Sequence, residues 1–174
     1  MGVVLKLERQ GMARLATFSE DRRYRYTLTR VWGDQAGERC AFILLNPSTA
    51  DAEKDDPTIR RCISYARRWG FAGLEILNLF AWRSTDPRAL RMVPDPVGPM
   101  NLANIVAVTR STPRIVCGWG VDPAVSAWRQ DARVLGELVA TGRELSALKV
   151  NADGSPAHPL YLSGELLPVP FAFG

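Results

Sequence analysis

The feature of this sequence that most restricts its fold is a series of four short apolar runs, separated by longer segments with helical periodicity. The runs are AFILL, LEILNL, IVCG and LSALKV, at residues 41–45, 74–79, 115–118 and 145–150. Strands that are buried on both faces carry near-continuous apolar runs of this kind, as in parallel sheets covered by helices. The pattern predicts an α/β fold with three layers, α/β/α, around a central, mainly parallel sheet.

Three segments between and beside these runs predict helices. Residues 57–69 repeat apolar side chains at helical spacing, after Asp56 and Pro57, which suit an N-cap and a first helical position. Residues 122–142 repeat this arrangement and predict one longer helix, and residues 99–109 predict a shorter one. The apolar stripe expected on the longer helix consists of Val125, Trp128, Ala132, Leu135 and Val139.

The N-terminal part of the chain predicts additional strands. The segment YRYTLTRVW, residues 24–32, alternates polar and apolar side chains at period two, which is typical of a half-exposed strand. We therefore expect antiparallel strands at the N-terminal edge of the sheet. The sequence contains no internal repeat and no long linker, and its 174 residues are enough for one core. A single domain over residues 1–174 is expected.

Composition excludes several classes of protein. No apolar stretch reaches membrane-spanning length, and the start MGVVLKLERQ lacks the apolar segment of a secretion signal, so we expect a cytoplasmic protein without a membrane partner. The three cysteines, Cys40, Cys62 and Cys117, are odd in number and widely spaced. They are expected to be small buried residues and to form neither a disulfide nor a metal site.

No cofactor is expected. The sequence has neither of the glycine-rich phosphate-binding motifs, GxxxxGK[ST] and GxGxxG, and the absence of GxSxG disfavours a serine hydrolase. One histidine and scattered carboxylates suit Zn²⁺ poorly, although Mg²⁺ stays open. The net charge of +4 is compatible with a polyanionic partner such as DNA.

Polar or aromatic residues follow the ends of all four apolar runs. Asn46 follows the first run, Asn78 lies inside the second just before its last residue, Trp119 follows the third, and His158, the only histidine, follows the fourth. The carboxyl ends of parallel strands meet at one edge of a sheet, where ligands bind in open α/β folds. We therefore expect these four residues to line one cleft.

Each of these residues also has a purely structural interpretation. The sequence Asn46-Pro47-Ser48 is typical of a turn. A buried amide such as that of Asn78 needs hydrogen bonds, and it could either tie two loops together or read the edge of a nucleobase. A single histidine in a loop, such as His158, is as often structural as functional.

The loop at residues 51–56 is rich in carboxylates. Asp55 and Asp56 are most simply a helix cap with a solvated neighbour, whereas Asp51 has no evident structural role. Arg83 could contact a phosphate group or pair with one of these aspartates. The sequence alone leaves both interpretations of Arg83 open.

Two resemblances extend this interpretation. The motifs YRYTLTRVW, LLNPSTAD, DDPTIRRC, NLFAWRSTDP and HPLYL together resemble DUF1643, a bacterial and phage family of unknown function, over nearly the whole chain. More distantly, the order of motifs within residues 43–162 is similar to that of the uracil-DNA glycosylase superfamily. In that superfamily one strand-end motif positions the attacking water, a later strand-end asparagine reads the base, and a His-Pro loop supplies the catalytic histidine and a residue that inserts into DNA.

The second resemblance implies a uracil-DNA glycosylase-like fold and a set of site residues. Catalytic roles are implied for Asn46 and His158, helped by Asp51 or Asp55. Substrate-binding roles are implied for Pro47, Ser48, Asn78, Arg83, Trp119, Leu160 and Tyr161. The chain departs from the superfamily after His158-Pro159, where Leu160-Tyr161-Leu162 replaces the usual serine and small wedge residue.

The function implied is that of a DNA glycosylase-like enzyme, which hydrolyses the N-glycosidic bond of uracil or of a modified base flipped out of DNA. Two other functions stay open from the sequence. A non-catalytic binder of nucleic acid or modified bases would not need His158 or Asp51. A hydrolase or transferase of free nucleotides would not need Leu160 or Tyr161.

Overall fold

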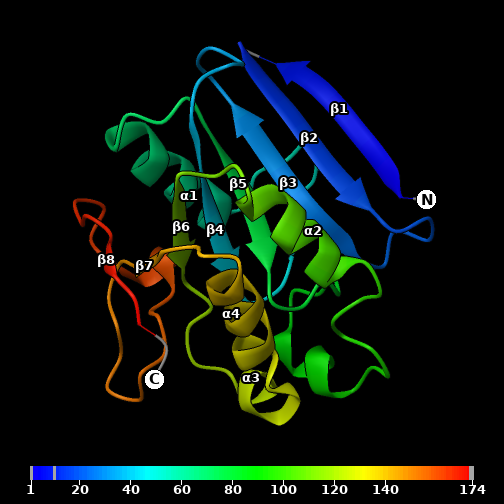
Figure 1. Cartoon of the computed structure of the whole chain (residues 1–174). Coiled ribbons are helices and arrows are strands. Elements are labelled where there is room, and N and C mark those ends of the chain that lie inside the picture. Colours follow the sequence, from blue (N-terminus) through cyan, green and yellow to red (C-terminus); the bar gives the residue numbers. More distant parts are fainter. Residues whose placement is uncertain (1, 10, 173–174) are drawn as a thin grey trace.

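The apolar runs form the centre of an eight-stranded mixed sheet in the computed structural model, which describes residues 2–9 and 11–172. The strand order is β1-β2-β3-β5-β4-β6-β7-β8 (Figure 1). The strands are β1 (Val3–Arg9), β2 (Met12–Phe18), β3 (Arg25–Val31), β4 (Arg39–Leu44), β5 (Gly73–Asn78), β6 (Arg114–Cys117), β7 (Leu145–Ala147) and β8 (Val169–Pro170).

The four central strands, β5, β4, β6 and β7, are parallel to one another. This confirms the parallel centre predicted from the apolar runs. Strands β1, β2 and β3 are antiparallel and join the centre through the pairing of β3 with β5, as expected for the N-terminal edge. The antiparallel strand β8 at the opposite edge was not expected, because a two-residue strand that contains a proline leaves no periodic pattern.

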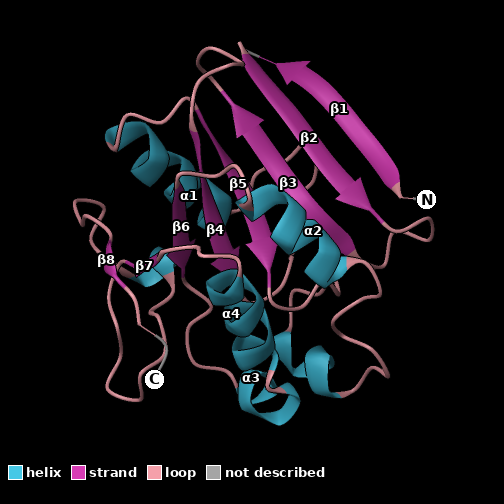
Figure 2. Cartoon of the chain, in the orientation of Figure 1, coloured by secondary structure: helices cyan, strands magenta, loops and turns pink. Residues whose placement is uncertain are grey.

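Helices cover both faces of the parallel centre (Figure 2). The α-helices are α1 (Pro57–Arg68), α2 (Asn101–Thr109), α3 (Pro123–Trp128) and α4 (Gln130–Ala140), and two short 3₁₀ helices are η1 (Pro87–Arg91) and η2 (Pro159–Tyr161). Along β4, Ala41 and Ile43 pack in the cluster that contains α2, α3 and α4, while Cys40 and Phe42 pack in the cluster that contains α1. The alternation places one core on each face of the sheet.

Helix α1 follows its sequence signals closely. The Asp56 side chain accepts a hydrogen bond from the Ile59 backbone N–H at 2.9 Å, and Pro57 occupies the first turn. Gly70, just beyond the C-terminal end, adopts a φ of +84°. These are the capping features that the sequence predicts, and they fix where the preceding loop enters the helix.

The single helix expected over residues 122–142 is wrong. Arg129 adopts a left-handed conformation with φ of +48°, which separates α3 from α4. The break changes the phase of the helical faces, so Trp128 and Val139 of the expected stripe are exposed, at 41% and 59%. The side chains of α4 that reach the core are Val134, Leu135 and Leu138.

Strand β3 is also more buried than its alternation predicts. Six of its seven residues are buried, and Arg25 and Arg30 are 2% and 0% exposed. The loop at residues 50–55 covers this strand, since its backbone carbonyls and the Asp55 carboxylate accept hydrogen bonds from both arginines. A polar position in a period-two pattern therefore faces a polar interior here and not solvent.

The three cysteines are free and buried, as expected. Burial raises the pKa of Cys40 to about 12 and raises the pKa values of Cys62 and Cys117 as well. Protonated thiols in apolar surroundings act as small core residues. Among the described residues, no helix is both long enough and apolar enough to cross a membrane.

Substitution of Gly73 tests how tightly β3 and β5 pair. A Cβ at this position would lie 2.6 Å from the Arg30 backbone oxygen and 3.2 Å from the Val31 Cα. We expect Gly73→Ala to lower the free energy of unfolding by about 1–3 kcal/mol, because the backbone must shift. Gly136→Ala is the matched control: a Cβ there meets nothing within 4 Å, and alanine in helix α4 should stabilise by about 0.5–1 kcal/mol. Urea unfolding of both variants measures the difference.

Candidate functional site

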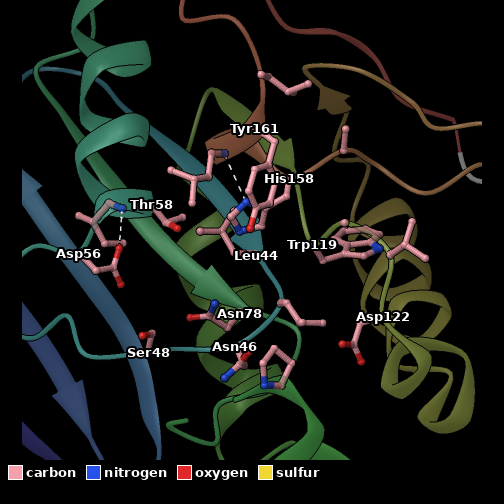
Figure 3. Close-up of a pocket in the computed structure, with 18 of the residues that line it drawn as sticks. Leu44, Asn46, Ser48, Asp56, Thr58, Asn78, Trp119, Asp122, His158 and Tyr161 are labelled. Atoms are coloured by element: carbon pink, nitrogen blue, oxygen red, sulfur yellow. Dashed lines mark hydrogen bonds between the residues drawn. The ribbon is translucent and has the colours of Figure 1, made fainter. Parts of the chain in front are cut away.

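A cavity of about 530 Å³ lies at the carboxyl ends of the parallel strands. The loops that follow β4, β5, β6 and β7 all contribute to its lining. In Figure 3, Asn46 and Asn78 lie toward one end of the cavity and His158 and Tyr161 toward the other, with Trp119 on a side wall. The N-terminal end of α1 adds Asp56 and Thr58 to the lining.

The expected convergence of the four strand ends is confirmed. The residues predicted from the sequence that line the cavity are Asn46, Ser48, Asn78, Trp119, His158, Leu160 and Tyr161. They meet because β5, β4, β6 and β7 run parallel side by side, so their carboxyl ends share one edge. The predicted residues Pro47, Asp51, Asp55 and Arg83 do not line this cavity.

Asn46 is anchored through its amino group. Its Nδ2 donates to the backbone oxygen of Ser84 at 2.9 Å and to that of Pro47 at 3.1 Å. These bonds tie the end of β4 to the loop after β5. Since carbonyl oxygens accept only from a donor, they fix the orientation of the amide. The Asn46 Oδ1 has no hydrogen-bond partner among the described residues and is available as an acceptor.

Asn78 is anchored through its oxygen. The side chain is 1% exposed, and its Oδ1 accepts a hydrogen bond from the Arg25 Nη2 at 3.1 Å. Its backbone oxygen accepts from the Asn101 Nδ2 at 2.9 Å. Within the part of the chain that the structure describes, the Asn78 Nδ2 has no acceptor. The two asparagines therefore offer opposite groups to a ligand, an oxygen from Asn46 and an N–H from Asn78.

His158 precedes η2 and is half-buried. Its Nδ1 accepts a hydrogen bond from the Leu160 backbone N–H at 3.3 Å. In the neutral imidazole this assigns the remaining proton to Nε2, which becomes a donor. Burial lowers the pKa of His158, and the Asp56 carboxylate opposes this shift only in part. Near neutral pH the ring is therefore an uncharged hydrogen-bond donor.

Gly118 and Gly120, the two glycines on either side of Trp119, allow η2 to approach the sheet. A Cβ on Gly118 would lie 2.9 Å from the Pro159 Cδ, and one on Gly120 would lie 3.3 Å from the His158 Cβ. Gly120 also adopts a φ of +72°, which favours glycine. Trp119 between them is 3% exposed and packs edge-on against Phe171. These three residues thus set both the wall of the cavity and the place of His158.

The carboxylates Asp51 and Asp55 have structural contacts outside the cavity. The Asp51 Oδ1 accepts from the backbone N–H groups of Glu53 and Lys54 at 2.8 and 2.9 Å, so it closes a turn. Asp55 forms ion pairs with Arg14 at 2.9 Å and with Arg30 at 2.8 Å. The interpretation of Asp55 as a solvated neighbour of the cap is wrong, because both arginines reach over from the antiparallel strands.

Arg83 lies in a depression beside the cavity. This depression is also lined by Arg22 and Arg23, and it shares Ser48 and Ser84 with the cavity wall. The Arg83 guanidinium stacks on the Phe18 ring at 4.9 Å and donates to the Arg22 backbone oxygen. It forms no ion pair within the described residues, so the expected alternative of pairing with an aspartate of the 51–56 loop is not observed.

The sequence interpretation missed several residues of the lining. Asp56 and Asp122 stand at positions that the sequence assigns only to helix caps. Both are caps, since the Asp56 Oδ1 accepts from the Ile59 N–H at 2.9 Å and the Asp122 Oδ1 from the Ala124 N–H at 2.8 Å. Both also line the cavity. Arg25, Lys149 and Asn151 carried no sequence signal. Residues 2–9 and 11–172 contain no group of three potential ligands that could hold a metal ion.

The lowered pKa of His158 predicts a dependence of stability on pH. The charged or titratable side chains that share its cavity are those of Asp56, Asp122, Arg25, Lys149 and Tyr161. As the pH falls below 6.5, His158 becomes protonated in the unfolded chain, whereas in the folded chain it becomes protonated only at a lower pH because its pKa is lowered. The free energy of unfolding therefore decreases with falling pH in this window. Urea unfolding at about pH 7.5 and about pH 5.5 should show this loss for the native sequence and a smaller loss for His158→Gln. An equal loss in both would contradict it.

Together these features define an α/β protein with one mixed sheet and a polar cavity at the carboxyl edge of its parallel strands. Residues 25–160 match the family DUF1643, described as a protein of unknown function, and the chain belongs to that family. No curated protein and no solved structure matches the chain significantly. The family match spans β3 to η2 and so includes Arg25, Asn46, Asn78 and His158.

Proposed function

We propose that this protein is a DNA glycosylase-like enzyme, which hydrolyses the N-glycosidic bond of uracil or of a modified base flipped out of DNA. One observation carries the proposal: the Asn46 Oδ1 and the Asn78 Nδ2, which have no hydrogen-bond partner within residues 2–9 and 11–172, share one cavity with the neutral His158. Its volume of about 530 Å³ suits a small planar ligand. A nucleobase edge presents both donors and acceptors, which this combination of groups can bind.

The reaction needs few functional groups. When the bond between the base and the sugar breaks, its electron pair stays on the base and positive charge develops on the sugar. In the proposed mechanism His158 donates its Nε2–H to a base oxygen as negative charge grows there. Asn46 accepts a hydrogen bond from the water and orients it toward the sugar. Asp56 places a negative charge on the same cavity, where it stabilises the positive sugar.

The depression lined by Arg22, Arg23 and Arg83 supports DNA as the substrate. Among the described residues, only Arg23 of these three forms an ion pair, with Asp21 at 2.6 Å. The depression shares Ser48 and Ser84 with the cavity, so a phosphate held there would lie beside a base held in the cavity. Arginine side chains with free N–H groups are suited to such phosphate contacts.

A side chain at the rim of the cavity allows a test of whether the substrate is DNA or a free nucleotide. Tyr161 is 83% exposed and lies next to His158, with 5.6 Å between the ring centroids. We expect Tyr161→Ala to lower base release from double-stranded DNA by about 10-fold, because the ring no longer fills the gap left by the flipped base. Val139→Ala, also at an exposed position, should have no effect. Unchanged activity of Tyr161→Ala on DNA would favour the free-nucleotide alternative.

The direct test is release of a base from DNA. Purified protein is incubated with oligonucleotides that carry uracil, hydroxymethylated bases or glycosylated bases, and abasic sites are revealed by cleavage in alkali. His158→Ala, prepared in the same way, serves as the control for contaminating activity. Abasic sites that depend on His158 support the proposal. Tight binding without abasic sites on any of these substrates would favour the non-catalytic alternative.

A further inference from the structure

Arg25 places a buried positive charge beside the cavity. Its side chain lines the cavity and is 2% exposed, yet no carboxylate among the described residues lies within ion-pairing distance. The guanidinium donates to the Ala50 backbone oxygen at 2.9 Å and to the Asn78 Oδ1 at 3.1 Å. Its Nε is buried and has no hydrogen-bond partner among the residues that the structure describes.

Arg30, in the same strand, shows that this fold can compensate a buried guanidinium. Arg30 is 0% exposed, and its Nη2 lies 2.8 Å from the Asp55 carboxylate. Burial of an unpaired charge is unfavourable, and proteins normally pair or neutralise it. Burial lowers the pKa of Arg25 to about 9, and the side chain keeps its charge at neutral pH. The charges of Asp56 and Asp51 oppose this shift only in part, and neither carboxylate forms an ion pair with Arg25, so a ligand oxygen with negative charge would complete its compensation.

The position of Arg25 follows from the sheet. Strand β3 runs antiparallel to β5, so the amino end of β3 meets the carboxyl end of β5. The Arg25 backbone N–H donates to the Ala81 backbone oxygen at 2.9 Å, just beyond Asn78. Arg25 therefore lies beneath the strand end that contributes Asn78. A charged donor on the Asn78 Oδ1 fixes the amide, turns its Nδ2 toward a ligand and makes that N–H a stronger donor.

We propose that Arg25 is a positioning residue: by orienting Asn78 it makes this end of the cavity selective for a ligand oxygen that carries negative charge. The preference for such a ligand does not depend on the proposed function. Only the part that this preference plays in the reaction rests on it. During hydrolysis the C1′–N bond breaks and its electron pair passes to the base, where carbonyl oxygens share the charge. Water forms the new bond to C1′ and loses a proton, and the base gains one. The class of base selected is an oxo base, such as uracil. An amino base, such as cytosine, would direct hydrogens at the Asn78 N–H.

Binding of free bases tests this inference apart from catalysis. Uracil and cytosine are titrated into ¹⁵N-labelled full-length protein, and affinities are taken from two-dimensional NMR spectra. The native protein should prefer uracil over cytosine by about 10- to 100-fold. The side-chain NH₂ signal of Asn78, assigned by comparison with Asn78→Ala, should shift with uracil.

The variants are Arg25→Met, which keeps the length of the side chain without its charge, and Arg25→Lys, which keeps the charge. Arg25→Met should lose the preference for uracil, and the Asn78 signal should no longer respond. Arg25→Lys should retain part of the preference, which a purely structural role would not require. If Arg25→Met does not fold, the preference measured in Arg25→Lys decides: a ratio equal to that of the native protein would overturn the inference.

The outcomes separate this inference from the proposed function. A folded Arg25→Met that prefers uracil as the native protein does would overturn the role of Arg25, even if the native protein releases uracil from DNA. Native protein that binds neither base, or binds both equally, would overturn it too. Failure of the proposed function is seen separately, as the absence of abasic sites. A preference for uracil that depends on Arg25, without abasic sites, would uphold the ligand class and reject hydrolysis.

Discussion

Replacement of His158 by alanine is expected to lower the rate of base release by about 100- to 1,000-fold, the usual effect of removing one donor to a developing oxyanion. The reason is the donor at Nε2, which the Leu160 N–H assigns by bonding to Nδ1. The side chain is only half-buried, so its truncation should leave the fold intact. Single-turnover kinetics on a labelled oligonucleotide measure the rate, and circular dichroism verifies the fold.

His158→Gln sharpens this prediction. A glutamine amide can donate a hydrogen bond at a similar distance from the backbone but does not titrate. It should retain more activity than His158→Ala, and its rate should not fall as the solution is acidified. The native rate should fall once the pH drops below the lowered pKa of His158, because protonation of Nδ1 breaks the bond from Leu160. If His158→Ala released the base at the rate of the native protein, His158 would have no part in the mechanism.

Removal of the Asp55 carboxylate is expected to cause the largest loss of stability. Asp55→Ala leaves Arg30, which is fully buried, and Arg14, which is 14% exposed, without their shared partner. Breaking a buried ion pair in this way costs about 3–5 kcal/mol, since an uncompensated charge stays in the interior. Denaturant unfolding measures the loss as a lower midpoint.

Two comparisons decide whether Asp55 is structural or catalytic. Arg88→Ala breaks an exposed pair with Asp86, whose side chains are 81% and 49% exposed, and it leaves the Asp86 cap of η1 in place, so it should change stability little. At a temperature where Asp55→Ala is folded, its rate of base release per folded molecule should equal that of the native protein. A loss of rate with full stability would restore the catalytic role that the sequence suggested for Asp55.

The central elements of the fold were predictable because their signals are local. The apolar runs became β4, β5, β6 and β7, and α1 begins at the residue that its cap predicts. The break at Arg129 was not predictable, since a left-handed arginine has no composition signal and the apolar spacing continues across it. The placing of β3 beside β5, which brings Arg25 to the cavity, depends on long-range pairing that periodicity does not record.

The candidate site likewise contains some residues that the sequence predicted and others that it did not. Asn46, Asn78 and His158 could be found because each lies near or beyond the end of an apolar run, and parallel strands force such positions to one edge. Asp55 was misplaced because its partners, Arg14 and Arg30, lie far away in the chain. Arg25 was missed because a polar residue in an alternating strand normally faces solvent.

By itself, then, the sequence determined which segments are buried strands and which polar residues stand at their ends, because burial and strand direction leave a local pattern of residue types. Only the tertiary structure decided which charges meet. Electrostatic partners act over a few ångströms in space whatever their separation in the chain, so the pairing of Arg30, the isolation of Arg25 and the fixed orientation of Asn78 exist only after the sheet has formed.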